Sequence, residues 1–129
     1  MRSITREITL PLDGGAADFR LTRLDAFSGV FLLRLLQRYM PEGEGGVPRF
    51  LADVPDYEMR VLMRACLNHA EIRLPAGWTP VMAGDEWEAP DLRYDTVSCV
   101  RLTAEVIRWT LADFFPGSGQ DSPPAPPAA

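Results

Sequence analysis

The chain has 129 residues, 47% of them hydrophobic, and its 18 acidic residues outnumber 13 basic residues, all arginine, to give a net charge of −5. These values are typical of one globular domain, and an acidic chain without a basic block is a poor candidate for binding nucleic acid. No apolar run is long enough for a membrane span, and the N-terminus lacks the apolar core of a signal peptide. We therefore expect a cytoplasmic protein that contacts no membrane.

The first pattern in the chain predicts a β-hairpin. Residues 4–12 alternate between apolar and polar side chains, and residues 17–22 alternate again, which is the two-residue period of half-buried strands. The two runs are joined by Asp13, Gly14 and Gly15, which are residue types that favour a tight turn. The apolar side of the first strand is predicted to carry Ile4, Ile8, Leu10 and Leu12, with Arg6 as its one exception.

Two long helices are predicted to follow the hairpin. Asp25 is a suitable N-cap for a helix that ends at about Met40, because a proline comes next. The second long helix begins near Pro55, a favourable first-turn residue, and ends at about Ala70. Residues 50–53 are a candidate for a short helical turn between the two.

The segment 71–90 has short periods and is broken by prolines and a glycine. Residues 72–74 and 80–82 are candidates for short strands. Residues 83–85 can turn the chain back towards Trp87, which predicts a second, short hairpin or an irregular segment.

A third long helix is predicted from a cap at Asp95 or Thr96 to about Phe115. Residues 116–129 are rich in proline, glycine, serine and alanine, and this composition predicts a disordered tail. The sequence thus predicts one α+β domain over residues 1–115.

The first and third long helices carry more apolar residues than a surface helix needs. Ten of the fifteen residues from Ala26 to Met40 are apolar and point in nearly all directions, and the third helix is similar. Two interpretations stay open. Either these helices are central to the core, or one flank of them binds a protein or a second copy of the chain.

The residue types that can act as catalysts or metal ligands are interpreted here as structural residues. His69, the only histidine, is expected to be partly buried and hydrogen-bonded, and Cys66 and Cys99 are expected to be reduced core residues. The acidic run from Asp85 to Asp95 is interpreted as a solvated loop, or else as a docking strip for a basic partner. We predict no catalytic residue, metal site or cofactor.

Several segments together resemble the small tail assembly chaperones of long-tailed phages and prophages. The resemblance spans residues 4–115 and is carried by Ile8-Thr9-Leu10-Pro11-Leu12-Asp13-Gly14, Phe19-Arg20-Leu21-Thr22-Arg23-Leu24-Asp25-Ala26-Phe27-Ser28-Gly29, Leu62-Met63-Arg64-Ala65-Cys66-Leu67-Asn68-His69, Leu74-Pro75-Ala76-Gly77 and Tyr94-Asp95-Thr96-Val97-Ser98-Cys99-Val100-Arg101-Leu102-Thr103, running on to Trp109 and Phe114-Phe115.

This resemblance implies a protein without catalytic activity. Such chaperones hold the long tape measure protein while the tail tube assembles around it, act in the cytoplasm of the bacterial host, and are absent from the finished virion. The implied partners are the tape measure protein, the major tail tube protein and further copies of the chain. A holder of an elongated apolar client needs exposed apolar surface, and weak contacts along one client add through avidity.

We predict that the working surface lies on the flanks of the first and third long helices. The candidate contacts are Phe31, Leu35, Trp109, Phe114 and Phe115. A structural adaptor or tail-completion protein of the phage particle is the first alternative. The second is a small enzyme with carboxylate chemistry between Asp85 and Asp95.

Overall fold

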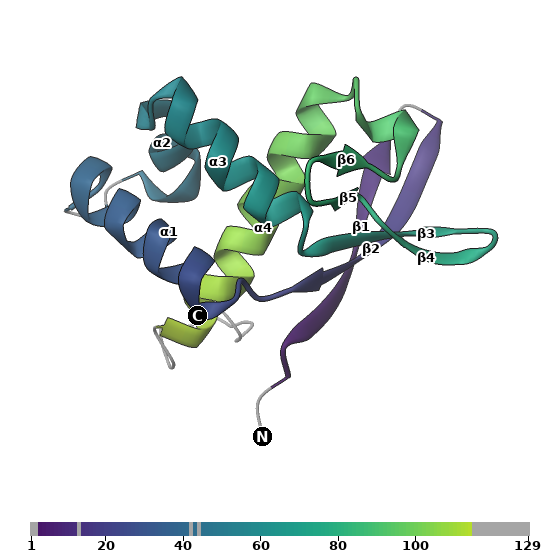
Figure 1. Cartoon of the computed structure of the whole chain (residues 1–129), viewed down its shortest axis with the longest axis horizontal. Helices are drawn as coiled ribbons and strands as arrows, with labels where there is room; N and C mark the ends of the chain where they lie inside the picture. Colours follow the sequence, from purple (N-terminus) through teal and green to yellow (C-terminus); the bar gives the residue numbers. More distant parts are fainter. Residues whose placement is uncertain (1–2, 13, 42, 44, 115–129) are drawn as a thin grey trace, which may run out of the picture.

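A computed structural model of the chain describes residues 3–12, 14–41, 43 and 45–114 (Figure 1). The fold is α+β, as the sequence predicts, with a four-stranded antiparallel sheet and a group of helices. The predicted disordered tail at residues 116–129 lies outside the described residues. No helix in the described part of the chain is long and apolar enough to cross a lipid bilayer.

The sheet has the strand order β1-β2-β3-β4. The predicted N-terminal hairpin is confirmed, with Thr5–Leu12 as β1 and Gly15–Thr22 as β2. Ala70–Leu74 forms β3 and pairs with β2, so that Phe19 lies opposite Ile72, and Gly77–Pro80 forms β4 on the outer edge. Periodicity alone did not predict that β3 extends the N-terminal hairpin.

The short second hairpin is confirmed, with Met82–Ala83 as β5 and Glu86–Trp87 as β6. The predicted strand at 80–82 is wrong, because the chain leaves the large sheet at Val81. The Val81 amide donates to the Ala70 carbonyl, and the Val81 carbonyl accepts from the amide of Glu88. Val81 therefore belongs to neither β4 nor β5.

The predicted long helices are present as α1 (Ala26–Tyr39), α3 (Asp56–Leu67) and α4 (Thr96–Phe114). The short helical turn is longer than expected and forms α2 (Gly46–Asp53), and Pro90–Leu92 forms the 3-10 helix η1. The second long helix was expected to reach about Ala70 but ends at Leu67. The chain turns into the sheet there, since the carbonyl of His69 accepts from the amide of Thr22.

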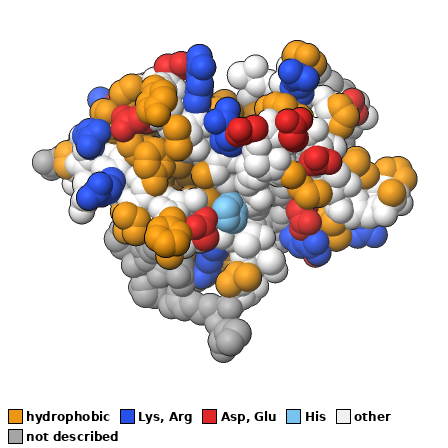
Figure 2. Space-filling view, in the orientation of Figure 1, with side chains coloured by type: hydrophobic (Ala, Val, Ile, Leu, Met, Phe, Trp, Pro, Cys, Tyr) orange, Lys and Arg blue, Asp and Glu red, His pale blue; other side chains and the backbone are white. Residues whose placement is uncertain are grey.

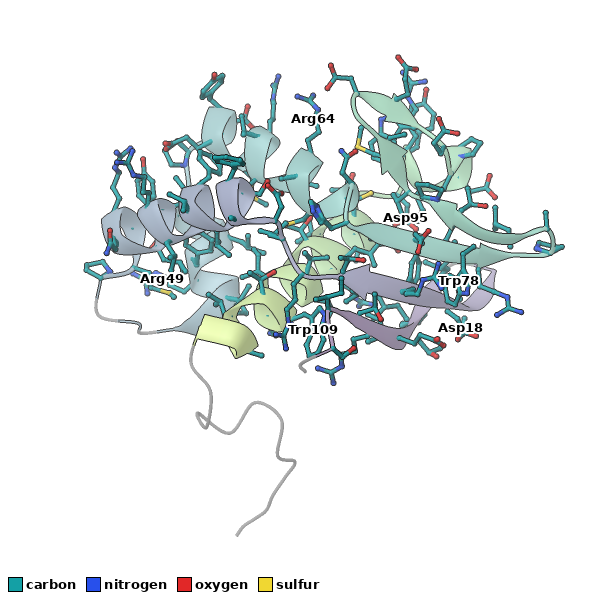
Figure 3. All side chains as sticks on the ribbon, turned by 60° about the horizontal axis from the view of Figure 1, so that its bottom comes forward. Asp18, Arg49, Arg64, Trp78, Asp95 and Trp109 are labelled. Carbon is teal, nitrogen blue, oxygen red and sulfur yellow. The ribbon has the colours of Figure 1, made fainter. Side chains whose placement is uncertain are left out.

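The two faces of the sheet differ in character. On the inner face, Phe19 and Leu21 are fully buried, while Ile4 precedes β1 and is 62% exposed, unlike its predicted half-buried position. On the outer face, the Arg20 side chain pairs with Glu71 at 2.7 Å and lies over the Trp78 ring at 4.7 Å from its centroid (Figure 3). The sheet is thus apolar towards the helices and polar away from them.

Helix α4 occupies the centre of the molecule. It contacts β1 and β2 on one side and α2 and α3 on the other, while α1 packs against α2 and α3 (Figure 1). Its residues Leu102, Val106 and Ile107 are fully buried and belong to one core cluster with Phe19, Leu21, Leu32, Phe50 and Leu62. The interpretation of the third long helix as a central core helix is therefore confirmed.

Candidate partner-binding surfaces

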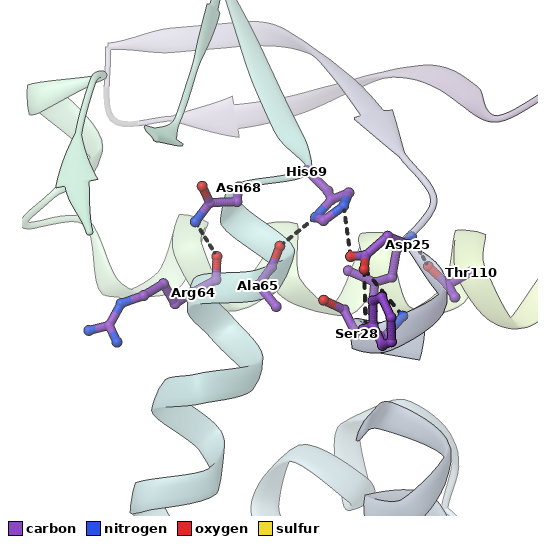
Figure 4. A network of polar contacts seen from close by, with 9 residues as sticks. Asp25, Ser28, Arg64, Ala65, Asn68, His69 and Thr110 are labelled. Atoms are coloured by element: carbon purple, nitrogen blue, oxygen red, sulfur yellow. Dashed lines mark hydrogen bonds and ion pairs between the residues drawn. The ribbon is translucent and has the colours of Figure 1, made fainter. Parts of the chain in front are cut away.

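A network of polar contacts fixes the start of α1 against α3 and α4 (Figure 4). The Asp25 carboxylate accepts from the amides of Phe27 and Ser28 at 3.2 and 3.5 Å, which confirms Asp25 as the N-cap. His69 Nε2 lies 3.5 Å from Asp25 Oδ1. One residue before the cap, the Leu24 amide donates to Thr110 Oγ1 on α4 at 3.0 Å.

His69 has the structural role that the sequence predicts. Its side chain is 22% exposed, and its Nδ1 lies 2.7 Å from the Ala65 carbonyl oxygen. A carbonyl oxygen only accepts, so Nδ1 carries the proton in this contact. Hydrogen bonding from Ser28 lowers the pKa of Asp25 below its ordinary value, and the neighbouring His69 lowers it further.

This anchoring leaves one face of α1 open. Gly29, Leu32 and Leu35 are the buried residues of the helix, whereas Phe27 is 90% exposed and Val30 is 54% exposed. Contiguous exposed apolar side chains mark interaction sites, whereas single ones are common on protein surfaces, so the neighbours of Phe27 decide what its exposure means. The sequence indicated an apolar surplus on this helix but not which side of it faces solvent.

Helix α3 extends this apolar face. It lies antiparallel to α1, because Glu58 near its start binds Tyr39 at the end of α1 at 2.7 Å, while its far end reaches Asp25 through His69. On α3, Tyr57 is 78% exposed and Val61 is 37% exposed, one helical turn apart. We define the α1–α3 surface by its exposed residues Phe27, Val30, Tyr57 and Val61; Figure 2 shows hydrophobic side chains gathered over these helices.

Arginines lie around the α1–α3 surface. Arg38 pairs with Glu58 at 3.3 Å and Arg60 pairs with Asp56 at 3.1 Å. Arg34 is exposed and has no ion-pair partner among the described residues. Helix α1 contains no acidic residue, so its open face combines apolar and basic side chains.

The predicted contact residues occupy different environments. Leu35 is only 2% exposed and belongs to the core, so it is not available as a surface contact, and Phe31 is half-buried against the core. Phe115 lies outside the described residues, as does the side chain of Phe114. Of this group, the two residues whose side chains the structure describes, Phe31 and Leu35, are not strongly exposed contacts on the α1–α3 surface.

Trp109, the remaining predicted contact, is partly buried and is held in place by contacts with other parts of the chain. Its indole Nε1 donates to the Ile4 carbonyl at 3.0 Å, and the guanidinium groups of Arg23 and Arg6 lie 4.0 and 5.7 Å from the ring centroid (Figure 3). This contact explains why Arg6 interrupts the apolar side of β1. Trp109 therefore joins α4 to the first strand.

A second candidate surface is a groove of about 1230 Å³ between the sheet and the start of α4. The inner face of the sheet contributes Leu12, Ala17 and Leu74 to it, and the opposite wall carries Tyr94 and Val97. These two wall residues are 83% and 62% exposed. Periodicity could not reveal this groove, because its residues come from both halves of the chain.

Two residues of the acidic run between Asp85 and Asp95 line this groove, Asp91 and Asp95. Glu86, Glu88 and Asp91 are exposed, and Asp95 caps α4 by accepting from the amide and the hydroxyl group of Ser98 at 3.1 and 2.8 Å. Among the described residues, no group of three or more histidine, cysteine, aspartate or glutamate side chains is placed to hold a metal ion.

Both cysteines are free and buried, as the sequence predicts. Burial raises the pKa of the Cys66 thiol far above its usual range. Burial, together with the Asp95 carboxylate, raises the pKa of Cys99 to about 11. A thiolate nucleophile needs a lowered pKa, so neither environment suits nucleophilic chemistry.

Comparisons of the chain with models of protein families, with curated proteins and with solved structures found no match.

Proposed function

We propose that the protein is a phage tail assembly chaperone, which binds the tape measure protein without catalysis and keeps it soluble while the tail tube forms. The observation that supports this proposal is the α1–α3 surface, where Phe27 and Tyr57 expose 90% and 78% of their side chains. The resemblance of the sequence to this family supplies the identity of the client. In this role the protein acts in the host cytoplasm and is absent from the mature virion.

The chemistry of the α1–α3 surface fits a helical, largely apolar client. Helices α1 and α3 run antiparallel and both expose apolar side chains, and the apolar stripe of a client helix can pack against such a pair. Arg34, which is exposed and has no ion-pair partner among the described residues, favours a client with an acidic residue beside its apolar stripe. Burying four side chains gives modest affinity, which suits a holder that must release its client.

Co-expression with the tape measure protein from the same tail gene cluster tests this proposal. We expect the tape measure protein to become more soluble and to co-purify with the chaperone. Tyr57→Ser should reduce the recovered tape measure protein at least several-fold, because Tyr57 belongs to the α1–α3 surface. Tyr94→Ser is the matched control, since Tyr94 is equally exposed but lies outside that surface, and this variant should retain the client.

A soluble tape measure protein that never co-purifies, or equal loss in both tyrosine variants, would contradict the proposal. Mass spectrometry of purified virions provides the independent check on the alternative role. A chaperone should be missing from the particle, whereas a structural adaptor or tail-completion protein should be present. The major tail tube protein should be tested as a second partner in the same co-purification.

A further inference from the structure

The groove between the sheet and the start of α4 has a lining that is apolar and balanced in charge. Two arginines and two aspartates line it, so their charges cancel. These are Arg73, Arg101, Asp91 and Asp95. The inner face of the sheet contributes the apolar side chains Leu12, Ala17, Ile72 and Leu74. A groove of this kind favours an occupant that is largely apolar and carries little net charge.

The wall of the groove offers hydrogen-bond donors. Arg101 is exposed and forms no ion pair or hydrogen bond with the described residues. Tyr94 is 83% exposed, and its hydroxyl group also has no hydrogen-bond partner in the described part of the chain. The Asp95 carboxylate, in contrast, already accepts from Ser98. The groove therefore suits a ligand that accepts hydrogen bonds and donates few.

One segment of this chain has that chemistry. Residues 123–127 read Pro-Pro-Ala-Pro-Pro, so they carry five carbonyl acceptors but a single backbone amide proton, that of Ala125. No residue from 122 to 129 is charged. Proline-rich segments favour the extended polyproline II helix, whose backbone groups are free to bond outwards and which loses little entropy on binding. Grooves with aromatic side chains are the usual receptors of such segments.

The chain between α4 and this segment is long enough to reach the groove. A rise of about 1.5 Å per residue places Arg101 about 20 Å from Phe114 along α4. Residues 115–121 span up to about 23 Å when extended, at about 3.3 Å per residue. This length brings Asp121 to the level of Arg101. Asp121 is the only charged residue after Phe114, and its charge is opposite to that of Arg101.

An exposed stripe of α4 provides the path between the two. Arg101 and Arg108 are exposed, and Glu105 between them is partly exposed and pairs with Arg108 at 2.9 Å. These residues lie on successive turns of one helix face. The same face continues to Val97, which lines the groove. A segment that follows this face back from the end of α4 stays on the surface and arrives at the groove.

We propose that the groove is the docking site of the chain's own proline-rich segment, residues 123–127. The proline rings pack against Tyr94 and Val97, the Tyr94 hydroxyl group donates to a carbonyl oxygen of the segment, and Asp121 pairs with Arg101. The tether of residues 115–122 gives the segment an effective concentration on the order of millimolar at the groove, so weak contacts are enough to occupy it. A proline-rich peptide from another protein has to displace the segment before it binds.

This docking does not depend on the proposed function. None of the residues that define the α1–α3 surface lines the groove. A docked segment therefore leaves Phe27 and Tyr57 open to a client, and each proposal can fail without the other.

Nuclear magnetic resonance of the full chain tests the docking from the side of the segment. The four-proline variant keeps the length of the chain and combines Pro123→Ser, Pro124→Ser, Pro126→Ser and Pro127→Ser. Pro116→Ser, which changes a proline of the tether, is the matched control. The backbone amide signals of Ala17, Leu74 and Val97 should shift in the four-proline variant and stay at their parent positions in Pro116→Ser. Unchanged signals of the buried residue Leu102 verify the fold of both variants.

Tyr94→Ser tests the docking from the side of the groove. Tyr57→Ser is its matched control, since Tyr57 is 78% exposed but lies outside the groove. The heteronuclear Overhauser effect of the Ala125 amide reports how firmly the segment is held. It should fall in Tyr94→Ser and keep its parent value in Tyr57→Ser. Because the docking occurs within one molecule, this value should not change on ten-fold dilution.

A synthetic peptide of residues 119–129 completes the test. It should shift the same groove signals when it is added to the four-proline variant, whose groove is open. At least ten-fold more peptide should be needed to reach the same shift in the parent protein, because the tethered segment competes with it.

Identical groove signals in the parent protein and the four-proline variant overturn the proposal, as does a peptide that binds both proteins equally. Signals that move on dilution would mean that the segment docks in a second copy of the chain, which also overturns it. An equal fall of the Ala125 value in both tyrosine variants would show that the groove does not hold the segment.

Discussion

At the scale of single residues, burial and hydrogen bonding give structural roles to side chains of the cysteine, histidine and aspartate types. Cys99 is 3% exposed, and its thiol donates to the Leu92 carbonyl at 3.2 Å. The Nδ1 atom of His69 contacts the Ala65 carbonyl oxygen, and its Nε2 atom lies beside the Asp25 carboxylate. The Asp95 carboxylate accepts hydrogen bonds from Ser98 in the first turn of α4. Each of these groups stabilises the fold through a specific contact.

The raised pKa of Cys99 predicts a loss of stability in alkali. The folded protein holds the thiol proton up to about pH 11, whereas a solvated thiol has a pKa of 9.0. The contribution of Cys99 to stability is therefore complete below about pH 9 and falls as the pH rises towards 11. Urea unfolding from pH 8 to 11 should show a smaller fall for Cys99→Ala than for the parent protein. Parallel curves for the two proteins would contradict this assignment.

At the scale of elements, the start of α1 is the junction on which the α1–α3 surface depends. Asp25 caps this helix, the Leu24 amide binds Thr110, and Phe27 projects into solvent immediately afterwards.

The outer edge of β1, in contrast to α1, has features that limit its use as a binding surface. The Ser3 side chain bonds both backbone groups of Thr5, and Pro11 has no amide proton, which limits strand addition at this edge.

Removing the cap should destabilise the protein by a measurable amount. Asp25→Ala should lower the free energy of unfolding by about 1 kcal/mol at neutral pH, as lost N-caps commonly do. Asp25→Asn should recover most of this loss because its amide oxygen can still accept from the helix. The lowered pKa of Asp25 adds a pH dependence, since its carboxylate stabilises the fold above its unfolded pKa near 3.8 and loses this effect as the pH falls further. Equal stability of Asp25→Ala and the parent protein from pH 3 to 7 would rule out this role.

At the scale of the whole molecule, α4 connects the sheet to the other helices. Its buried residue Leu102 should be among the most sensitive positions, because truncating a fully buried leucine leaves a cavity. Leu102→Ala should cost about 2–5 kcal/mol of unfolding free energy. Val97→Ala on the same helix should change it by less than about 0.5 kcal/mol, since Val97 is 62% exposed. Similar costs at the two positions, measured by urea unfolding, would contradict the central placement of α4.

Elements that depend on neighbouring residues could be predicted from the sequence, whereas contacts between residues far apart in the chain could not. The cap at Asp25, the alternation along β1 and the turn at Gly84 depend on neighbouring residues and were found from the sequence. The pairing of Phe19 with Ile72 joins residues far apart in the chain, so no local period reports it. An all-round apolar helix such as α1 likewise does not reveal which face is buried, and the exposure of Phe27 emerges only from its packing partners.

The burial of both cysteines has a practical consequence for labelling. Because Cys66 and Cys99 are the only cysteines of the chain and both lie inside the folded molecule, the native surface presents no thiol to a reagent. A cysteine introduced at Tyr57 or Tyr94 is then a unique attachment point for a fluorophore or a crosslinker. Each of the two candidate surfaces can thus be followed by spectroscopy in an otherwise unmodified chain.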